Sequence, residues 1–152
     1  MIKNIMIIKK NLYKKIMESI PIVCIDVIIM NEKNEYLLVK RKNNPLKNKF
    51  WMVGGRLYKN EMLIDGIKRK ISEEIGVKKC PIKYVGFFEE FFNKTEQNIN
   101  SNFHAISFVY KALINSKTKI KIDNQSTEYK WFKKLPPLFK KVIPWYKKRA
   151  FN

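Results

Sequence analysis

Apolar and polar residues alternate along the chain with two different periods, and these periods predict the order of the elements. Continuous or alternating apolar runs are typical of strands. The expected strands are residues 22–30, 36–41, 50–53, 82–92, 103–113 and 129–132. A turn at residues 31–34 would join the first two into a hairpin spanning 22–41. Polar, Asn-rich stretches at 93–101 and 115–127 predict loops between the later strands.

The N-terminal residues 1–19 predict a short basic helix. Leu12, Ile16 and Ile20 are spaced by four and therefore fall on one face of it. Pro21 should end this helix, because proline disfavours a helical backbone at the residue that precedes it.

The stretch 54–77 carries the clearest helical pattern and most of the candidate chemistry. Apolar residues spaced by four predict a face that can be buried: Leu63, Ile67, Ile71 and Ile75. Charged residues with the same spacing predict a second face: Glu61, Asp65, Arg69 and Glu73. Glu73 and Glu74 are adjacent carboxylates, which repel each other unless a cation neutralises them. A hard divalent ion such as Mg²⁺, which prefers oxygen ligands, would do so.

The order of these elements predicts an α/β fold. Strands lie before and after one central helix, and a helical tail interrupted by prolines is expected from Leu135 onward. A mixed sheet between helices accommodates this order. No internal repeat is visible, and we expect residues 1–152 to form a single domain.

The charge balance points to an anionic partner. The chain has 32 Lys and Arg against 13 Asp and Glu, a formal net charge of +19. Such an excess favours a nucleotide, a nucleic acid or a membrane surface. The lysines are spread along the whole chain, however, so we do not expect a dedicated nucleic-acid surface.

Cysteine usage and hydropathy indicate the compartment. Cys24 and Cys80 are the only cysteines, which gives neither a disulfide framework nor a zinc pattern. Lysines interrupt the N-terminal apolar residues, unlike a signal peptide. The longest apolar run, residues 20–30, contains Asp26 and is too short to span a bilayer. We therefore expect a soluble cytoplasmic protein without a membrane partner.

The central stretch resembles the Nudix box. That pattern reads G, five residues, E, seven residues, R-E-U, one residue, E-E, one residue, G-U, where U is apolar. The matching positions here are Gly55, Glu61, Arg69, Ile71, Glu73, Glu74, Gly76 and Val77. Only Lys70 departs from the pattern, since the family has Glu at this position.

The resemblance implies the Nudix fold, an α/β/α sandwich with a mixed sheet, and hydrolysis of nucleoside diphosphates linked to another group. It implies Mg²⁺ as the cofactor, with Mn²⁺ as an alternative. Glu73, Glu74 and the carbonyl of Gly54 are the implied ligands, and Arg69 should pair with Glu61. Lys70 cannot ligate a metal ion while it is charged.

A second resemblance covers roughly residues 10–132 and concerns the GDP-mannose mannosyl hydrolases, which also lack the Glu at the position of Lys70. The segments that carry it include IPIVCIDVII, EYLLVKRKNNP, FWMVGGRLYKNE, GFFEEFF and NQSTEYKW. These enzymes attack the anomeric carbon and release GDP and the sugar with inversion. The resemblance implies a nucleotide-sugar substrate and a homodimer.

Several functional positions carry over from this subfamily. Asp26 matches an aspartate near the sugar, and Gln125 matches a metal-ligating glutamine. Arg41 and Arg56 match two arginines that support the leaving diphosphate, a role that suits a bidentate guanidinium. With Glu74, these two arginines are the candidate catalytic residues. Asp26, Arg41, Arg56 and Glu90 are the candidate substrate-binding residues, and Gly54, Glu73, Glu74 and Gln125 are the candidate metal ligands.

The sequence departs from the subfamily at the sugar-activating positions. The catalytic histidine is replaced by Ser126, which cannot accept a proton usefully near pH 7. A second family histidine falls at Glu90, and a nucleotide-binding tyrosine falls at Ala105. The only histidine, His104, is interpreted as structural. The carboxylates that could substitute for the missing base are Glu90, Asp123 and Glu128.

Two other functions stay open at this point. One is an ordinary Nudix pyrophosphohydrolase that attacks phosphorus, which product analysis would distinguish. The other is a module that has lost catalysis and binds a nucleotide sugar or RNA. Ser126 and Lys70 favour the binding module, whereas the retained Glu61, Glu73, Glu74 and Arg56 count against it.

Overall fold

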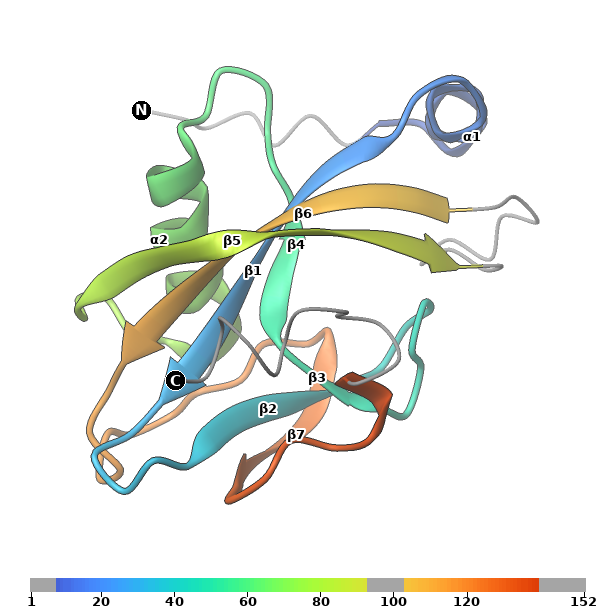
Figure 1. The fold of residues 1–152 in the computed structure, drawn as a ribbon. Helices are drawn as coiled ribbons and strands as arrows, with labels where there is room; N and C mark the ends of the chain where they lie inside the picture. The colour runs from blue at the N-terminus through green and yellow to red at the C-terminus, as the bar shows by residue number, and fades with distance from the viewer. Residues whose placement is uncertain (1–7, 93–102, 140–152) are drawn as a thin grey trace.

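The computed structural model describes residues 8–92 and 103–139, and it has a mixed β-sheet with helices packed on it (Figure 1). The predicted α/β fold with a mixed sheet is confirmed. The elements are α1 (Lys10–Ser19), β1 (Ile22–Met30), β2 (Tyr36–Arg41), β3 (Phe50–Trp51), β4 (Val53–Arg56), α2 (Leu63–Ile75), β5 (Ile82–Phe92), β6 (Phe103–Leu113) and β7 (Ser126–Phe132).

Strand β1 is the centre of the sheet. It runs parallel to β6 along its whole length and antiparallel to β4 and β2. Its side chains alternate between the two faces. Ile25, Val27 and Ile29 pack with α2, whereas Ile22 and Cys24 on the opposite face pack with α1. Because both faces of β1 are covered, its sequence is almost continuously apolar.

The other edge of β1 is shared by two strands, and this divides the sheet. Residues 24–27 pair with β4, and only Ile29 and Met30 pair with β2. The predicted hairpin over 22–41 is therefore limited to the two residue pairs next to its turn, because the earlier part of β1 is hydrogen-bonded to β4. Strand β2 in turn pairs with β3 and β7, and β5 pairs with β6.

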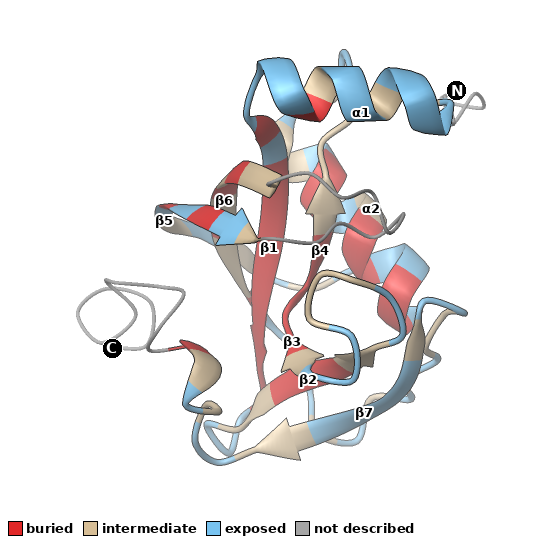
Figure 2. Ribbon diagram, turned by 90° about the vertical axis from the view of Figure 1, so that its right-hand side faces the viewer, coloured by how far each residue is buried: buried red, intermediate tan, exposed pale blue. Residues whose placement is uncertain are grey.

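Helix α2 packs on the sheet through the face that the spacing predicts. Ile67, Ile71 and Ile75 are at most 2% exposed, and Leu63 is partly buried beside them. Figure 2 shows the buried side of α2 turned toward β1 and β4. The helix ends at Gly76, whose φ of 74° is a left-handed conformation that glycine adopts without strain.

Helix α1 packs through a different face from the predicted one. Met17 is its buried residue, and Tyr13 and Ile16 pack beside it. Leu12 and Ile20 are more than half exposed. The contacting residues follow the i, i+3, i+4 rule, whereas the predicted face used a spacing of four alone, which drifts around the helix.

Three other predicted boundaries were wrong. Glu61 precedes α2, which begins at Leu63 with Met62 as its N-cap. The strand expected at 50–53 is two short strands, so both glycines of the Gly54-Gly55 pair lie inside β4. Strand β7 begins three residues before the expected Tyr129.

Some predictions fall outside the described residues. These are the first part of the N-terminal helix, the loop at 93–101 and the helical tail beyond Phe139. Within the part of the chain that the structure describes, no helix is long and apolar enough to cross a membrane.

Candidate functional site

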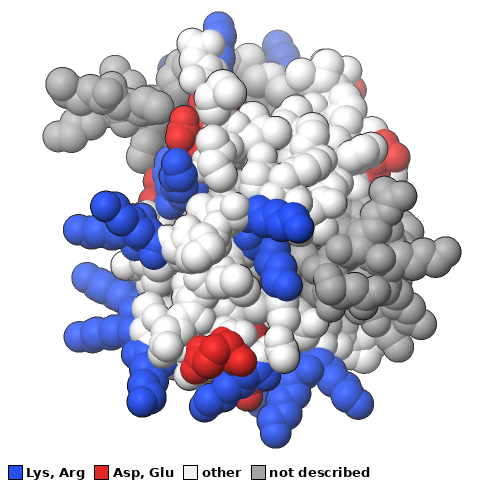
Figure 3. Space-filling model, turned by 60° about the vertical axis from the view of Figure 1, so that its left-hand side comes forward, with Lys and Arg blue, Asp and Glu red and all other residues white. Residues whose placement is uncertain are grey.

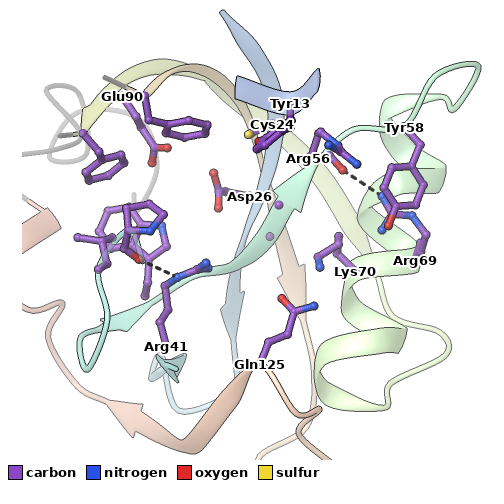
Figure 4. Close-up of a pocket in the computed structure, with 17 residues that line it drawn as sticks. Tyr13, Cys24, Asp26, Arg41, Arg56, Tyr58, Arg69, Lys70, Glu90 and Gln125 are labelled. Carbon is purple, nitrogen blue, oxygen red and sulfur yellow. Dashed lines mark hydrogen bonds between the residues drawn. The ribbon is translucent and has the colours of Figure 1, made fainter. Parts of the chain in front are cut away.

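A pocket of about 210 Å³ lies between β1, β4 and the nearby edge of α2 (Figure 4). It brings together six of the eight predicted site residues: Asp26, Arg41, Gly54, Arg56, Glu90 and Gln125. They come from five different strands or their flanking loops, so only the tertiary fold places them around one space. Glu73 and Glu74 do not line the pocket. Tyr13, Tyr58, Phe92 and Phe103 add aromatic surface to its walls.

The cationic side chains of the pocket converge from different elements. Arg41 lies at the end of β2, where its Nε donates to the carbonyl of Pro45 at 3.2 Å. Arg56 lies at the end of β4, with its guanidinium carbon 5.2 Å from the ring centroid of Tyr13 and 5.9 Å from that of Tyr58. Planar contacts of this kind hold a guanidinium in place and leave its N–H donors available to an anion.

Arg69 has a structural role, as the sequence predicted. Its Nε and Nη2 donate to the two carboxylate oxygens of Glu61 at 2.6 and 2.9 Å. The same guanidinium stacks on Tyr58 and donates to the backbone carbonyl of Arg56 at 3.3 Å. This hydrogen bonding holds the pKa of Glu61 below its usual range. The network fixes the loop before α2 against the end of β4, and so positions Arg56.

Asp26 is a carboxyl group buried in the sheet at the base of the pocket. It is 6% exposed, and one of its oxygens accepts a hydrogen bond from the hydroxyl of Ser107 on the neighbouring strand β6. Burial raises its pKa to about 6, although Ser107, Arg41 and Lys70 all favour the charged form. Asp26 therefore changes charge near neutrality, the property of a general base at physiological pH.

Glu90 is the second buried carboxyl group of the pocket. It extends from β5 and is 7% exposed, and burial together with the charge of Asp26 raises its pKa well above the usual range. Its Oε1 has no hydrogen-bond partner among the described residues. A buried polar atom without a partner is costly, so its position on the pocket wall favours an interaction with a bound molecule.

Gly54 allows β4 to pass close to Asp26. A Cβ atom at this position would lie 2.3 Å from Oδ1 of Asp26 and 2.4 Å from the backbone carbonyl of Ile25. Any other residue would displace either the carboxylate or the strand. The Nudix resemblance implies that the Gly54 carbonyl is a metal ligand. The structure shows a further reason for glycine at this position, which is that β4 passes too close to Asp26 for a side chain.

The two carboxylates among the predicted metal ligands are each paired with a basic side chain, and in that state they do not fit a divalent ion. Lys70 Nζ lies 2.6 Å from Oε1 of Glu74, and both side chains are almost fully buried. The backbone N–H of Gly54 donates to the same oxygen at 3.4 Å. Glu73 is partly exposed and pairs with Arg69 at 3.2 Å. Across residues 8–92 and 103–139, no three His, Cys, Asp or Glu side chains gather into a group that could hold a metal ion.

The other candidate residues differ in whether they line the pocket. Among the carboxylates proposed to replace the missing base, only Glu90 lines the pocket. Glu128 forms an ion pair with Lys40 at 2.9 Å, and Asp123 accepts a hydrogen bond from the backbone of Gln125. His104 lies outside the pocket, where it stacks on Phe91 and contacts Glu89 at 3.3 Å.

Two features of the site were missed in the sequence. Ser107 is fully buried and holds Asp26, although the two are 81 residues apart. The pairing of Lys70 with Glu74 was also missed, although their spacing of four residues on a helix is the available signal.

The buried pair of Lys70 and Glu74 gives a stability prediction. Glu74→Gln should lower the free energy of unfolding by about 3–5 kcal/mol, because it leaves the Lys70 ammonium buried without a counter-charge. Urea denaturation measures the change. Glu73→Gln is the matched control on the exposed neighbour, for which we expect less than about 1 kcal/mol. Equal stability of the two variants would contradict the pairing.

The positive charge on the face shown in Figure 3 is dispersed. Lys and Arg side chains stand in separate groups along the left and lower margins and near the middle of this face, with uncharged surface between them. Nucleic-acid surfaces typically gather such charges into a patch or stripe. This face therefore lacks that pattern. The charged candidate residues converge at the pocket instead.

Comparisons with known proteins agree with the fold and the central motif. The family model of the NUDIX domain matches residues 21–146. The low-salt glycan biosynthesis protein Agl8 of Haloferax volcanii is 27% identical over 125 residues, which cover 82% of this chain and 78% of that protein. The ADP-ribose pyrophosphatase of Methanocaldococcus jannaschii is 39% identical over 69 residues, 45% of this chain and 40% of that protein.

A solved structure has the same architecture. The MutT NUDIX hydrolase of Burkholderia pseudomallei superposes with a TM-score of 0.66 at 22% identity, and the match covers 78% of this chain and 88% of that one. The family model extends over most of the chain, including every strand and α2. The chain therefore belongs to the Nudix family of hydrolases.

Proposed function

We propose that the protein hydrolyses a nucleoside-diphosphate sugar such as GDP-mannose and releases the free sugar and the nucleoside diphosphate. The observation that carries the proposal is a pocket in which arginines face two buried carboxyl groups. The arginines suit a diphosphate, and the carboxyl groups suit proton transfer and contact with sugar hydroxyls.

Arg41 and Arg56 would support the departing diphosphate. In the reaction, a water oxygen forms a bond to the anomeric carbon, and the bond from that carbon to the diphosphate oxygen breaks. The electron pair leaves with the diphosphate, so negative charge develops on it. Guanidinium donors already fixed by Pro45, Tyr13 and Tyr58 can stabilise that charge without a large rearrangement.

Asp26 and Glu90 would divide the proton chemistry between them. Their environments shift both pKa values upward, but Asp26 is stabilised as an anion by Ser107 and Glu90 is not. At neutral pH, Asp26 is largely ionised and can accept the proton of the attacking water. Burial and the charge of Asp26 raise the pKa of Glu90 and so favour its protonated form, which can donate a hydrogen bond to a sugar hydroxyl. Two carboxyl groups held at different pKa values commonly take such separate roles.

The size and walls of the pocket agree with this class of substrate. A volume of about 210 Å³ is below the usual range for a complete ligand pocket, roughly 300–1,000 Å³. It can hold the sugar and the diphosphate, while the nucleoside extends over the rim. The aromatic side chains there offer stacking surface to a base. The similarity to a glycan biosynthesis protein also favours a sugar-linked nucleotide.

A second candidate is attack at phosphorus, as in an ordinary Nudix pyrophosphohydrolase. The segment of 39% identity to an ADP-ribose pyrophosphatase favours it. The products distinguish the candidates, because attack at phosphorus yields a sugar phosphate and a nucleoside monophosphate.

The experiment is a panel of nucleotide sugars, including GDP-mannose, GDP-glucose and ADP-ribose, assayed with and without Mg²⁺. We expect a free sugar and a nucleoside diphosphate from at least one GDP-sugar. A sugar phosphate with a nucleoside monophosphate would support the second candidate. Nucleotide binding without turnover of any compound would instead indicate the binding module.

A further inference from the structure

Nudix enzymes generally use a divalent metal ion. In this chain, the ammonium group of Lys70 is paired with the carboxylate of Glu74, which would otherwise be available to bind such an ion. We propose that the Lys70 ammonium is a built-in cation that replaces a divalent ion against Glu74, and that the pocket binds the diphosphate of its substrate without a bound metal. The proposal deepens the function above and rests on its diphosphate-containing substrate. It follows from three observations on the position of Lys70.

The first contact is the ion pair itself. Lys70 and Glu74 are one turn apart on α2, and their charged atoms are 2.6 Å apart. The lysine side chain is 8% exposed and the glutamate side chain 4%, so neither charge is well solvated. A divalent ion at Glu74 would have to expel the ammonium and then remain beside it. Two positive charges at such a distance repel strongly in a poorly solvated site.

The second contact is with β4. A Cβ atom on Gly55 would lie 3.3 Å from Cε and 3.4 Å from Nζ of Lys70, and the φ of Gly55 is 155°. The absence of a side chain at Gly55 therefore gives the lysine its path between α2 and β4. The neighbouring Gly54 N–H donates to the oxygen of Glu74 that also contacts Lys70. Both donors therefore contact the one oxygen of Glu74 that a metal ion at this carboxylate would need.

The third observation is that Lys70 lines the pocket. It shares the space with Asp26, Arg41 and Arg56, and Figure 4 shows its side chain extending from α2 toward β4. Its charge also contributes to the ionisation of Asp26. An ammonium in this place can contact a phosphate oxygen while its ion pair with Glu74 keeps it oriented. With the two arginines, the pocket then offers three cationic groups to one diphosphate.

The test measures binding and does not depend on turnover. The first measurement titrates the full chain with Mn²⁺ and follows the free ion by electron paramagnetic resonance. The second titrates it with GDP by calorimetry, in EDTA and in Mg²⁺. For the wild-type protein we expect no Mn²⁺ bound at sub-millimolar concentration. We also expect GDP affinities that differ by no more than about twofold between EDTA and Mg²⁺.

Lys70→Glu is the informative variant, because it places a third carboxylate beside Glu73 and Glu74. We expect it to gain Mn²⁺ binding and to lose GDP affinity in EDTA by about tenfold or more, as for a lost hydrogen bond to a charged group. Added Mg²⁺ should restore part of that affinity. Lys68→Glu is the matched control, since Lys68 lies on the same helix and is well exposed beside Asp65. It makes the same charge change and should behave as the wild type.

Lys70→Gln keeps the test decisive if the glutamate variant does not fold. It removes the charge with little change of size, and GDP affinity in EDTA should again fall about tenfold. The proposal is overturned if the wild-type protein binds Mn²⁺ tightly, or if Lys70→Gln binds GDP in EDTA as the wild type does. Neither outcome depends on whether a nucleotide sugar is hydrolysed, so failure of the proposed function would be recognised separately by the product assay.

Discussion

Asp26→Asn is expected to lower kcat by about 10²- to 10⁴-fold, the usual contribution of a positioned general base. The amide keeps the shape of the side chain and can still accept a hydrogen bond from Ser107, but it cannot take a proton from water. The effect should appear mainly in kcat, because the diphosphate is held by other residues. Steady-state kinetics on the best nucleotide sugar measure it. A variant with more than half of the wild-type kcat would exclude Asp26 as the base.

The pH dependence of kcat/KM tests the role of Asp26 as general base independently. Since burial raises the pKa of Asp26 to about 6, kcat/KM should rise with pH through that value and level off above it. This acidic limb would resemble that of an imidazole although no histidine lines the pocket. Asp26→Asn should remove the limb, whereas His104→Gln should keep it. The opposite pattern would assign the limb to His104.

Asp26 should make folding stability fall as pH rises, whereas it makes kcat/KM rise. Its pKa is higher in the folded protein than the value of about 3.9 expected when unfolded, so folding takes up a proton between these values. The stabilisation is fully present below about pH 4 and is lost as pH rises to about 6. The loss should be on the order of 3 kcal/mol, and Asp26→Asn should flatten this part of the curve.

Arg41→Ala and Arg56→Ala should each lower kcat by roughly 10- to 10³-fold, as expected for losing one donor that stabilises developing charge. The guanidinium groups approach the pocket from β2 and β4, so each would contact a different part of the diphosphate. Lys83→Ala is the control, because it removes one positive charge from the exposed side of β5. It should leave kcat within about twofold of the wild type.

Whether these substitutions change kcat or only KM distinguishes two roles for the arginines. An effect on kcat means that they interact more strongly with the departing diphosphate than with the bound substrate. An effect confined to KM would mean that they bind the diphosphate equally in both states. In that case the leaving-group role proposed for Arg41 and Arg56 would be wrong, although the pocket would still be a nucleotide site.

Local patterns in the sequence were sufficient for the elements nearest the core. The spacing of Ile67, Ile71 and Ile75 predicted the buried face of α2, and the apolar run at 22–30 predicted β1. Both signals depend only on the period of the backbone. The face of α1 was assigned incorrectly, because the packing of Met17 depends on β1 and β6 and not on the helix alone.

The site was predictable as a set of residues but not as an arrangement. The motif and its flanking segments identified Asp26, Arg41, Arg56 and Glu90, and the fold brings all four to one pocket. The pairing of Asp26 with Ser107 depends on the register of two parallel strands, which no local pattern specifies. The two raised pKa values likewise depend on burial that only the assembled sheet creates.

The central claim is that water attacks the anomeric carbon of a nucleotide sugar. The most direct test is hydrolysis of GDP-mannose, or of the best substrate from the panel, in water enriched in oxygen-18, with mass spectrometry of both products after brief reaction. Because a free sugar slowly exchanges its anomeric oxygen with water, the unlabelled nucleoside diphosphate is the decisive product. We predict oxygen-18 in the sugar and none in the nucleoside diphosphate. Oxygen-18 in a phosphate group of either product would show attack at phosphorus and contradict the account.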